Sequence, residues 1–131
     1  MKYSYTAVIT PNDTNTKFFV RIPDLPGCIT SGKSIEDAIE MAADAACVWL
    51  VAAEDQGDPV IAPTPQYDIP HDENDILSVV LIDTIKYRSE TDTRAVRKNV
   101  SLPAWMASLA DKRGINCSQV LQEGLAKVFG M

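Results

Sequence analysis

Residues 95–130 carry the pattern of one short strand followed by two short amphipathic helices, and this set is too small to enclose a hydrophobic core. The lone strand would also leave backbone hydrogen-bonding groups unpaired along its edges. Both problems disappear when two copies of the segment pair their strands antiparallel and interlock their helices. The sequence therefore predicts a homodimer that forms through the C-terminal part of the chain.

The helix boundaries in this segment are marked by residues with clear local preferences. The strand ends at Leu102, and Pro103 suits the first helical position because its missing N–H would have no partner there. Gly114 ends this helix, and Asn116 caps the next one, with Gln119 three residues later as in a capping box. Apolar residues line one side of each helix: Met106, Leu109 and Ala110 in the first, and Val120, Leu121, Leu125, Val128 and Phe129 in the second.

This layout resembles that of the ribbon-helix-helix proteins, in which a two-stranded ribbon enters the major groove of DNA. When the apolar Val96, Val100 and Leu102 face the helices, the alternate residues of the strand face outward. Arginine suits guanine, asparagine suits adenine, and serine is a short, adaptable donor. Base contacts are therefore expected from three residues: Arg97, Asn99 and Ser101.

Phosphate contacts are expected from Lys98 and from the start of the second helix, where the backbone amides of Asn116, Cys117 and Ser118 are suited to an anion. Lys98 departs from the ribbon pattern, because it alternates with the inward-facing residues, where an apolar side chain is usual. Residues 94–131 carry six Lys or Arg against two acidic residues, a balance that suits a DNA-binding module.

The N-terminal part predicts a small sheet with one long helix on one face. Alternating strands at 3–10 and 17–22 and a short strand at 28–31 precede a helix at 35–56. A connection with four prolines then leads to a buried strand at 76–84. The expected class is α+β, with a βββαβ domain at 1–86, a linker at 87–94 and the strand-helix-helix domain at 95–131.

Charge is divided unevenly along the chain. Residues 1–75 carry four Lys or Arg against thirteen acidic residues, whereas residues 76–131 carry eight against five. The division suggests a cationic partner for the front and nucleic acid for the back. The alternative is the ordinary surface charge of a soluble protein.

Four segments of the front half have a specific pattern: YTAV at 5–8, FVRIPDLPGC at 19–28, TSGKSIEDA at 30–38 and IAPTP at 61–65. Together with the tail, they resemble the HicB antitoxin family. The resemblance covers nearly the whole chain and implies a partial RNase H-like fold in front. It also implies that the chain neutralises a small HicA-type toxin, an mRNA-cleaving ribonuclease, and represses its own operon by binding operator DNA through the tail.

The expected toxin contacts are acidic, because acidic surfaces suit a basic, RNA-binding partner. Four of them crowd one side of the long helix, and the fifth lies in the PDLPG turn: Glu36, Asp37, Glu40, Asp44 and Asp24. We expect Asp24 to accept backbone hydrogen bonds within its own turn. Occlusion of a toxin needs no chemistry from this chain.

An enzymatic role is not expected. An RNase H-like nuclease needs carboxylates that converge on two ions, with an acid on the first strand, and YSYTAVIT has none. One histidine, and three cysteines without CxxC spacing, disfavour a zinc site and fit a reduced cytoplasmic protein. No cofactor is expected, and no stretch is apolar for long enough to span a bilayer.

A competing hypothesis is a ribbon-helix-helix transcription regulator whose N-terminal domain senses a small ligand. A small basic protein encoded next to this chain would favour the antitoxin. The expected assembly is a homodimer through the tail, or a higher oligomer built from it.

Overall fold

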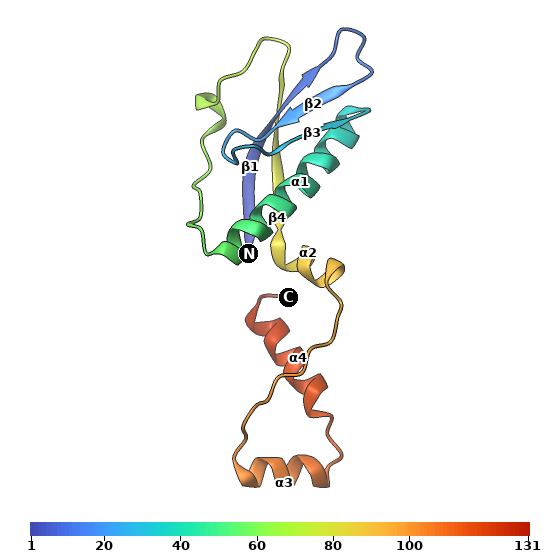
Figure 1. Cartoon of the computed structure of the whole chain (residues 1–131), viewed down its shortest axis with the longest axis vertical. Coiled ribbons are helices and arrows are strands. Elements are labelled where there is room, and N and C mark those ends of the chain that lie inside the picture. The colour runs from blue at the N-terminus through green and yellow to red at the C-terminus, as the bar shows by residue number, and fades with distance from the viewer. The chain divides into compact units, whose positions relative to one another are not determined.

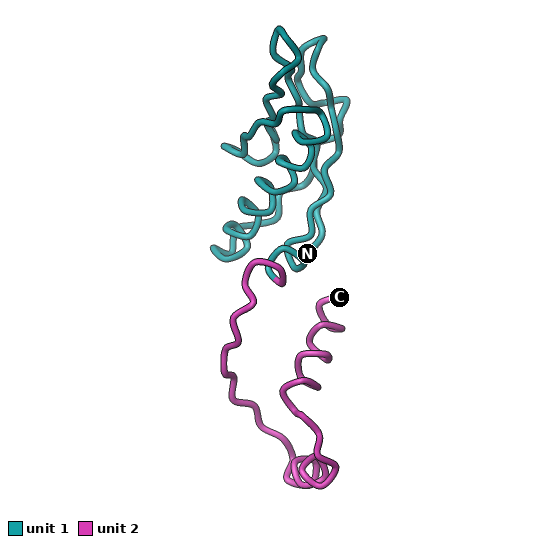
Figure 2. Tube along the Cα trace, turned by 90° about the vertical axis from the view of Figure 1, so that its right-hand side faces the viewer, with its two compact units in different colours: residues 1–88 teal, residues 89–131 magenta.

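The computed structural model describes all 131 residues of the chain. The chain divides into two compact units, residues 1–88 and residues 89–131 (Figure 2). We call them unit 1 and unit 2 and describe each by itself. No helix in either unit is both long and apolar enough to cross a membrane.

Unit 1 is built on an antiparallel sheet of four strands in the order β3-β2-β1-β4 (Figure 1). The strands are β1 (Lys2–Pro11), β2 (Phe18–Arg21), β3 (Ile29–Gly32) and β4 (Ile76–Asp83). Tyr5 lies opposite Val80 and Ile9 opposite Val20, so apolar side chains of neighbouring strands meet on one face. The predicted α+β class is confirmed, and each strand end lies within one residue of its expected position.

Helix α1 (Ile35–Gln56) covers the apolar face of the sheet. It begins where the Ser34 side chain accepts a hydrogen bond from the Asp37 N–H at 3.0 Å, and it ends at Gly57, whose φ is 73°. At Gly32 the sheet lies so close to α1 that an added Cβ would overlap with the backbone of Ala38. The buried side of α1 repeats every fourth residue: Ala38, Ala42, Ala46 and Leu50.

The connection between α1 and β4 is held against the sheet. The Tyr5 hydroxyl donates to the carbonyl of Ile61 at 2.6 Å, and the Arg21 guanidinium donates to the carbonyl of Pro70 at 2.8 Å. Ile69, which follows the 3-10 turn η1 (Gln66–Asp68), is buried. Most of residues 57–75 are exposed, and these contacts hold the segment against the rest of unit 1.

Helix α2 (Thr84–Thr91) occupies most of the segment that the sequence predicted as a linker at 87–94. The sequence analysis did not predict this polar helix, which tertiary contacts hold in place. The Asp83 carboxylate accepts hydrogen bonds from the N–H groups of Ile85 and Lys86, both at 3.1 Å. Arg88 forms ion pairs with Glu54 at 3.1 Å and Asp55 at 3.0 Å.

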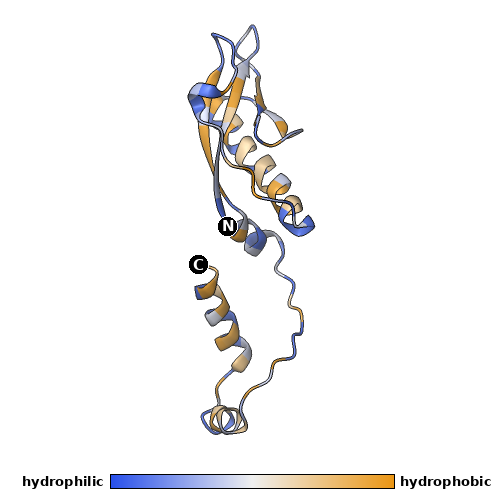
Figure 3. Ribbon diagram, turned by 90° about the vertical axis from the view of Figure 1, so that its left-hand side faces the viewer, coloured by the Kyte–Doolittle hydropathy of each residue, from blue (hydrophilic) through white to orange (hydrophobic).

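Unit 2 contains helices α3 (Ala104–Lys112) and α4 (Cys117–Val128), with apolar and polar sides that Figure 3 shows in orange and blue. Pro103 precedes α3 rather than forming its first residue. The strand predicted to end at Leu102 is absent, and residues 92–103 have no regular structure in the single chain. A strand needs a hydrogen-bonding neighbour, and this chain supplies none.

Candidate functional site

Among the acidic residues in the first half of α1, one helps to hold the start of the helix and the other three are exposed. The Asp37 carboxylate accepts a hydrogen bond from the Lys33 N–H at 2.8 Å, so it helps to hold the start of the helix. Glu36, Glu40 and Asp44 are exposed and four residues apart, so they lie on one side of α1. We call these three residues the acidic stripe. No group of three or more His, Cys, Asp or Glu in the structure is arranged to hold a metal ion.

No positive charge within α1 balances the negative charge of the acidic stripe. Helix α1 contains no Lys or Arg over its 22 residues. Like charges four residues apart destabilise a helix by roughly 0.2–0.5 kcal/mol per pair, and the stripe contains two such pairs. A cationic partner at this surface would relieve that repulsion.

Asp24 has a different role from the one expected. Its carboxylate accepts hydrogen bonds from the Thr64 N–H at 2.8 Å and the Thr64 hydroxyl at 2.5 Å. The bonds reach the connection to β4 and not the backbone of its own turn, because that turn already pairs its groups internally: the N–H of Cys28 bonds to the carbonyl of Leu25 at 2.9 Å. Asp24 is half-buried and lies away from α1 in the sequence, so it is not part of the acidic stripe.

The PDLPG turn is fixed from a second side as well. The Trp49 indole N–H donates to the carbonyl of Pro26 at 2.9 Å, which ties the turn to α1. The turn is therefore held between α1 and the connection to β4. Its fixed shape suits a contact surface, because little conformational entropy is lost when a partner binds.

Glu54 forms a polar cluster that the sequence analysis missed. Its carboxylate accepts hydrogen bonds from the hydroxyls of Tyr3 at 2.7 Å and Thr84 at 2.9 Å and from the Arg88 guanidinium at 3.1 Å. Burial favours a higher pKa for this carboxyl, but the three hydrogen bonds outweigh it and hold the pKa below its usual value. Burial and the bond to Glu54 raise the pKa of Tyr3 to about 12. The cluster joins β1, α1 and α2, which is a structural role.

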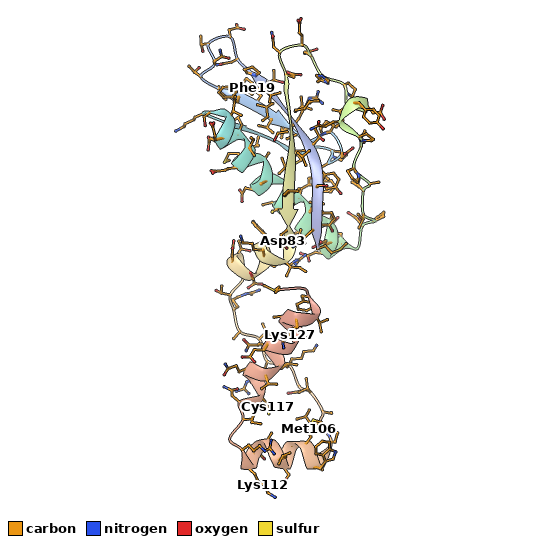
Figure 4. The ribbon with its side chains drawn as sticks, turned by 180° about the vertical axis from the view of Figure 1, so that it is seen from behind. Phe19, Asp83, Met106, Lys112, Cys117 and Lys127 are labelled. Atoms are coloured by element: carbon orange, nitrogen blue, oxygen red, sulfur yellow. The ribbon has the colours of Figure 1, made fainter.

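The residues expected to contact DNA are all exposed. Arg97, Lys98, Asn99 and Ser101 lie in the irregular segment before α3, so their alternation remains a prediction. At the start of α4, the Asn116 side chain accepts a hydrogen bond from the Gln119 N–H at 3.2 Å, which confirms the expected cap. Cys117 and Ser118 follow in the first turn of α4, and the Cys117 thiol is free (Figure 4).

Unit 2 has an apolar concavity and no buried residue. The concavity encloses about 320 Å³. It is lined mainly by apolar side chains from the extended segment and from both helices: Val100, Leu102, Met106, Leu109, Val120 and Leu121. Residues 89–131 contain no side chain that is fully removed from solvent. An isolated unit 2 therefore lacks the core that a stable fold requires.

Comparison with known proteins identifies the family. A family model described as a HicB-like antitoxin of a bacterial toxin-antitoxin system matches residues 5–124. The chain belongs to the HicB-like antitoxins. The match spans both units, so the resemblance seen in the sequence is confirmed for nearly the whole HicB-like chain. No curated protein sequence matches the chain significantly.

Solved structures of similar fold include antitoxins alone and in complexes. A toxin-antitoxin complex from Streptococcus pneumoniae has a chain with TM-score 0.61 and 21% identity, and the match covers 97% of this chain and 99% of that one. The crystal structure of antitoxin HicB3 has TM-score 0.53 and 29% identity over 96% of this chain and 98% of that one. A HicA3–HicB3 complex has TM-score 0.50 and 26% identity over 62% of this chain and 99% of the other.

Proposed function

We propose that this HicB-like antitoxin neutralises a basic HicA-type ribonuclease by covering its RNA-binding surface with unit 1, and that paired copies of unit 2 bind operator DNA. The division of charge carries this proposal. Unit 1 has fourteen acidic residues against six Lys or Arg, whereas unit 2 has four acidic residues against six. One chain thus carries a surface for a cationic protein and a surface for an anionic polymer.

The toxin-binding surface includes the acidic stripe on α1. A ribonuclease attracts its substrate with positive charge, and the stripe offers the opposite charge on a rigid helix whose first turn is capped. Asp24 contributes by holding the PDLPG turn to Thr64, and Asp37 by holding the start of α1. Direct contacts are expected from Glu36, Glu40 and Asp44. A complex of HicA3 with HicB3 supports a toxin of the HicA type as the partner.

The DNA-binding surface needs two copies of unit 2. In the single chain, the apolar concavity is open and residues 92–103 have no strand partner. A second copy would supply both an antiparallel partner for the strand and apolar side chains for the concavity. In that ribbon-helix-helix arrangement Arg97, Asn99 and Ser101 face bases, while Lys98 and the first turn of α4 face phosphates. DNA binding by such a dimer would let the antitoxin repress its own operon without catalytic chemistry.

Charge reversal of the acidic stripe tests the toxin-binding surface. The triple variant Glu36→Lys, Glu40→Lys, Asp44→Lys is expected to bind a HicA-type toxin at least roughly ten-fold more weakly, because it places like charge against the toxin. Affinity is measured by calorimetry, and function by protection of an RNA substrate from the toxin. Circular dichroism checks that the variant keeps its helix content.

The matched control reverses three exposed acidic residues in the connection to β4. The variant Asp58→Lys, Asp68→Lys, Glu73→Lys changes the net charge of unit 1 by the same amount without touching α1. It is expected to retain toxin binding within a small factor. Equal losses in the two variants would show that the toxin responds to total charge and would remove the acidic stripe from the proposal.

A further inference from the structure

A serine in the segment between α2 and α3 follows two cationic residues. Ser101 comes three residues after Lys98 and four after Arg97, and Leu102 comes directly after it. Protein kinases discriminate among substrates partly by charge, and one class of serine/threonine kinase pairs its own carboxylates with cations three or four positions before the hydroxyl. The spacing around Ser101 suits a kinase of this class, which we call basophilic.

Ser89 provides an internal comparison, because its sequence context is similar but its structure is different. It comes three residues after Lys86 and one after Arg88. Ser89 lies within α2, however, and Arg88 is already paired with Glu54 and Asp55. A kinase cleft takes its substrate as an extended peptide, since the hydroxyl must reach the transferred phosphoryl group in line. The helix and the occupied Arg88 therefore disfavour Ser89 as a substrate.

Ser101, in contrast, lies in backbone that such a cleft accepts. Residues 92–103 have no regular structure, and Figure 2 shows this part of unit 2 as an extended stretch before α3. Ser101, Arg97 and Lys98 are all exposed. The two cations form no ion pair within the chain. The hydroxyl and both cations that a kinase would recognise are thus accessible together.

We propose that Ser101 is phosphorylated by a basophilic serine/threonine kinase, and that this modification releases the chain from its operator while toxin neutralisation continues. In the reaction, the Ser101 Oγ forms a bond to the γ-phosphorus of ATP as the bond from that phosphorus to the β,γ-bridging oxygen breaks. The hydroxyl proton passes to a carboxylate of the kinase, and ADP leaves with the bridging oxygen. The products are phosphoserine and ADP.

The effect on operator binding follows from charge, and this step rests on the proposed function of unit 2. Unit 2 carries six Lys or Arg against four acidic residues, an excess of two positive charges. A phosphoserine adds a charge of about −1.5 to −2 at pH 7, which cancels most of that excess. The new charge would also stand where Ser101 is expected to face a base, between the two phosphate backbones of the DNA. Each dimer would carry two such groups.

Toxin neutralisation would be spared, because the acidic stripe belongs to the other unit. Glu36, Glu40 and Asp44 lie in unit 1, whereas Ser101 lies in unit 2. Added negative charge also creates no repulsion toward a cationic toxin. Phosphorylation would therefore open the operon to transcription without releasing the toxin.

Phosphate incorporation into the full chain tests the modification. With Mg-ATP and a basophilic serine/threonine kinase, mass spectrometry is expected to place phosphate on Ser101 at least about ten-fold faster than on Ser89. The variant Ser101→Ala should lose this incorporation, the matched control Ser89→Ala should keep it, and Lys98→Ala should slow it by removing a recognised cation. Equal rates at the two serines, or no phosphate on Ser101, would overturn the proposal. So would a Ser101 that carries no phosphate in chain purified from both growing and starved cells of its native host.

Binding assays of the phosphorylated and mock-treated full chain test the consequence. Operator affinity is expected to fall at least roughly ten-fold on phosphorylation, with inhibition of a HicA-type toxin unchanged. Ser101→Asp and Ser101→Asn have side chains of equal size, so a weaker operator affinity in the aspartate variant isolates the effect of charge. Equal operator affinity with and without phosphate, or a parallel loss of toxin inhibition, would overturn the regulatory role. Absence of operator binding in both samples would instead contradict the proposed function and leave only the modification of Ser101.

Discussion

The carboxylates of unit 1 show that the same chemical group serves two purposes in this fold. Asp24 and Glu54 accept short hydrogen bonds from residues far along the chain and hold segments together. Glu40 and Asp44, in contrast, are exposed on α1. Sequence alone placed Asp24 and the helix residues in one group, because the bonds to Thr64 depend on a chain reversal that brings two distant segments together.

At the residue scale, the most specific prediction concerns the side chains expected to face outward from the ribbon. Replacing Arg97 or Asn99 with Ala should cost about 1–3 kcal/mol of binding free energy on the cognate operator and little on unrelated DNA, because each side chain would read a base. The measurement is a binding titration on operator and scrambled duplexes. An Arg97→Ala, Asn99→Ala double variant with unchanged operator affinity would place the opposite strand face, including Lys98, against the DNA.

A second cation in unit 2 provides the control for that experiment. Lys112 is exposed in the last turn of α3 and is expected to act on DNA only through phosphate charge (Figure 4). Lys112→Ala should weaken binding to both duplexes alike and reduce the salt dependence by about one unit. A loss restricted to the operator would show that Lys112 reads bases.

At the element scale, α3 and α4 have amphipathic sides but no core to share within one chain. Local sequence signals mark where both helices begin: Asn116 caps α4, and Pro103 lies immediately before α3. Leu121 and Leu125 nevertheless remain exposed, at 37% and 41%. Local sequence thus sets where the helices begin, and we expect their stability to depend on a partner surface.

The tail variant Leu121→Asp is expected to dissociate the unit 2 dimer, because it would place a charge among apolar side chains of two copies. The measurement is the dissociation constant from sedimentation equilibrium, and a rise of at least about 100-fold is expected for a buried unpaired charge. The neighbouring exposed residue provides the matched control, and Gln122→Asp should leave the constant nearly unchanged. Identical constants in the two variants would remove α4 from the dimer interface.

At the scale of the whole molecule, the excess of acidic residues and the excess of basic residues lie in separate units. Unit 1 has its own core, which includes Tyr5, Ile9, Leu25 and Leu50, and Phe19 and Asp83 mark opposite ends of its sheet (Figure 4). Unit 2 has none. The two units are therefore expected to differ in how far they function alone.

A fragment of residues 1–91, which keeps α2 intact, should fold and bind the toxin. Its apparent affinity should be lower than that of the full chain by a factor that reflects lost bivalency, about 10²–10⁴ at most. The measurement compares toxin inhibition by fragment and full chain at matched concentration, with circular dichroism as the folding control. A folded fragment with no toxin binding would move inhibition to unit 2.

Much of unit 1 followed from local pattern. The alternating apolar residues of 3–10 and the run at 76–84 predicted strands, and Ser34 and Gly57 marked both ends of α1 correctly. These signals are short-range, so neighbouring residues are sufficient to express them. The helix at residues 84–91 was not predicted. The polar helix α2 is held by Asp83 and by the ion pairs of Arg88, and no sequence periodicity encodes such contacts.

The sequence by itself determined the α+β class, the charge division, the helix caps and the family to which the chain belongs. Tertiary structure alone decided which acidic residues are used internally, that Gly32 must lack a side chain beneath α1, and that β4 forms an open apolar edge. The physical reason is the separation along the chain over which each kind of interaction acts. Caps and alternation act over a few residues, whereas hydrogen bonds such as Asp24–Thr64 and the position of a strand at an edge depend on segments that only the folded chain brings together.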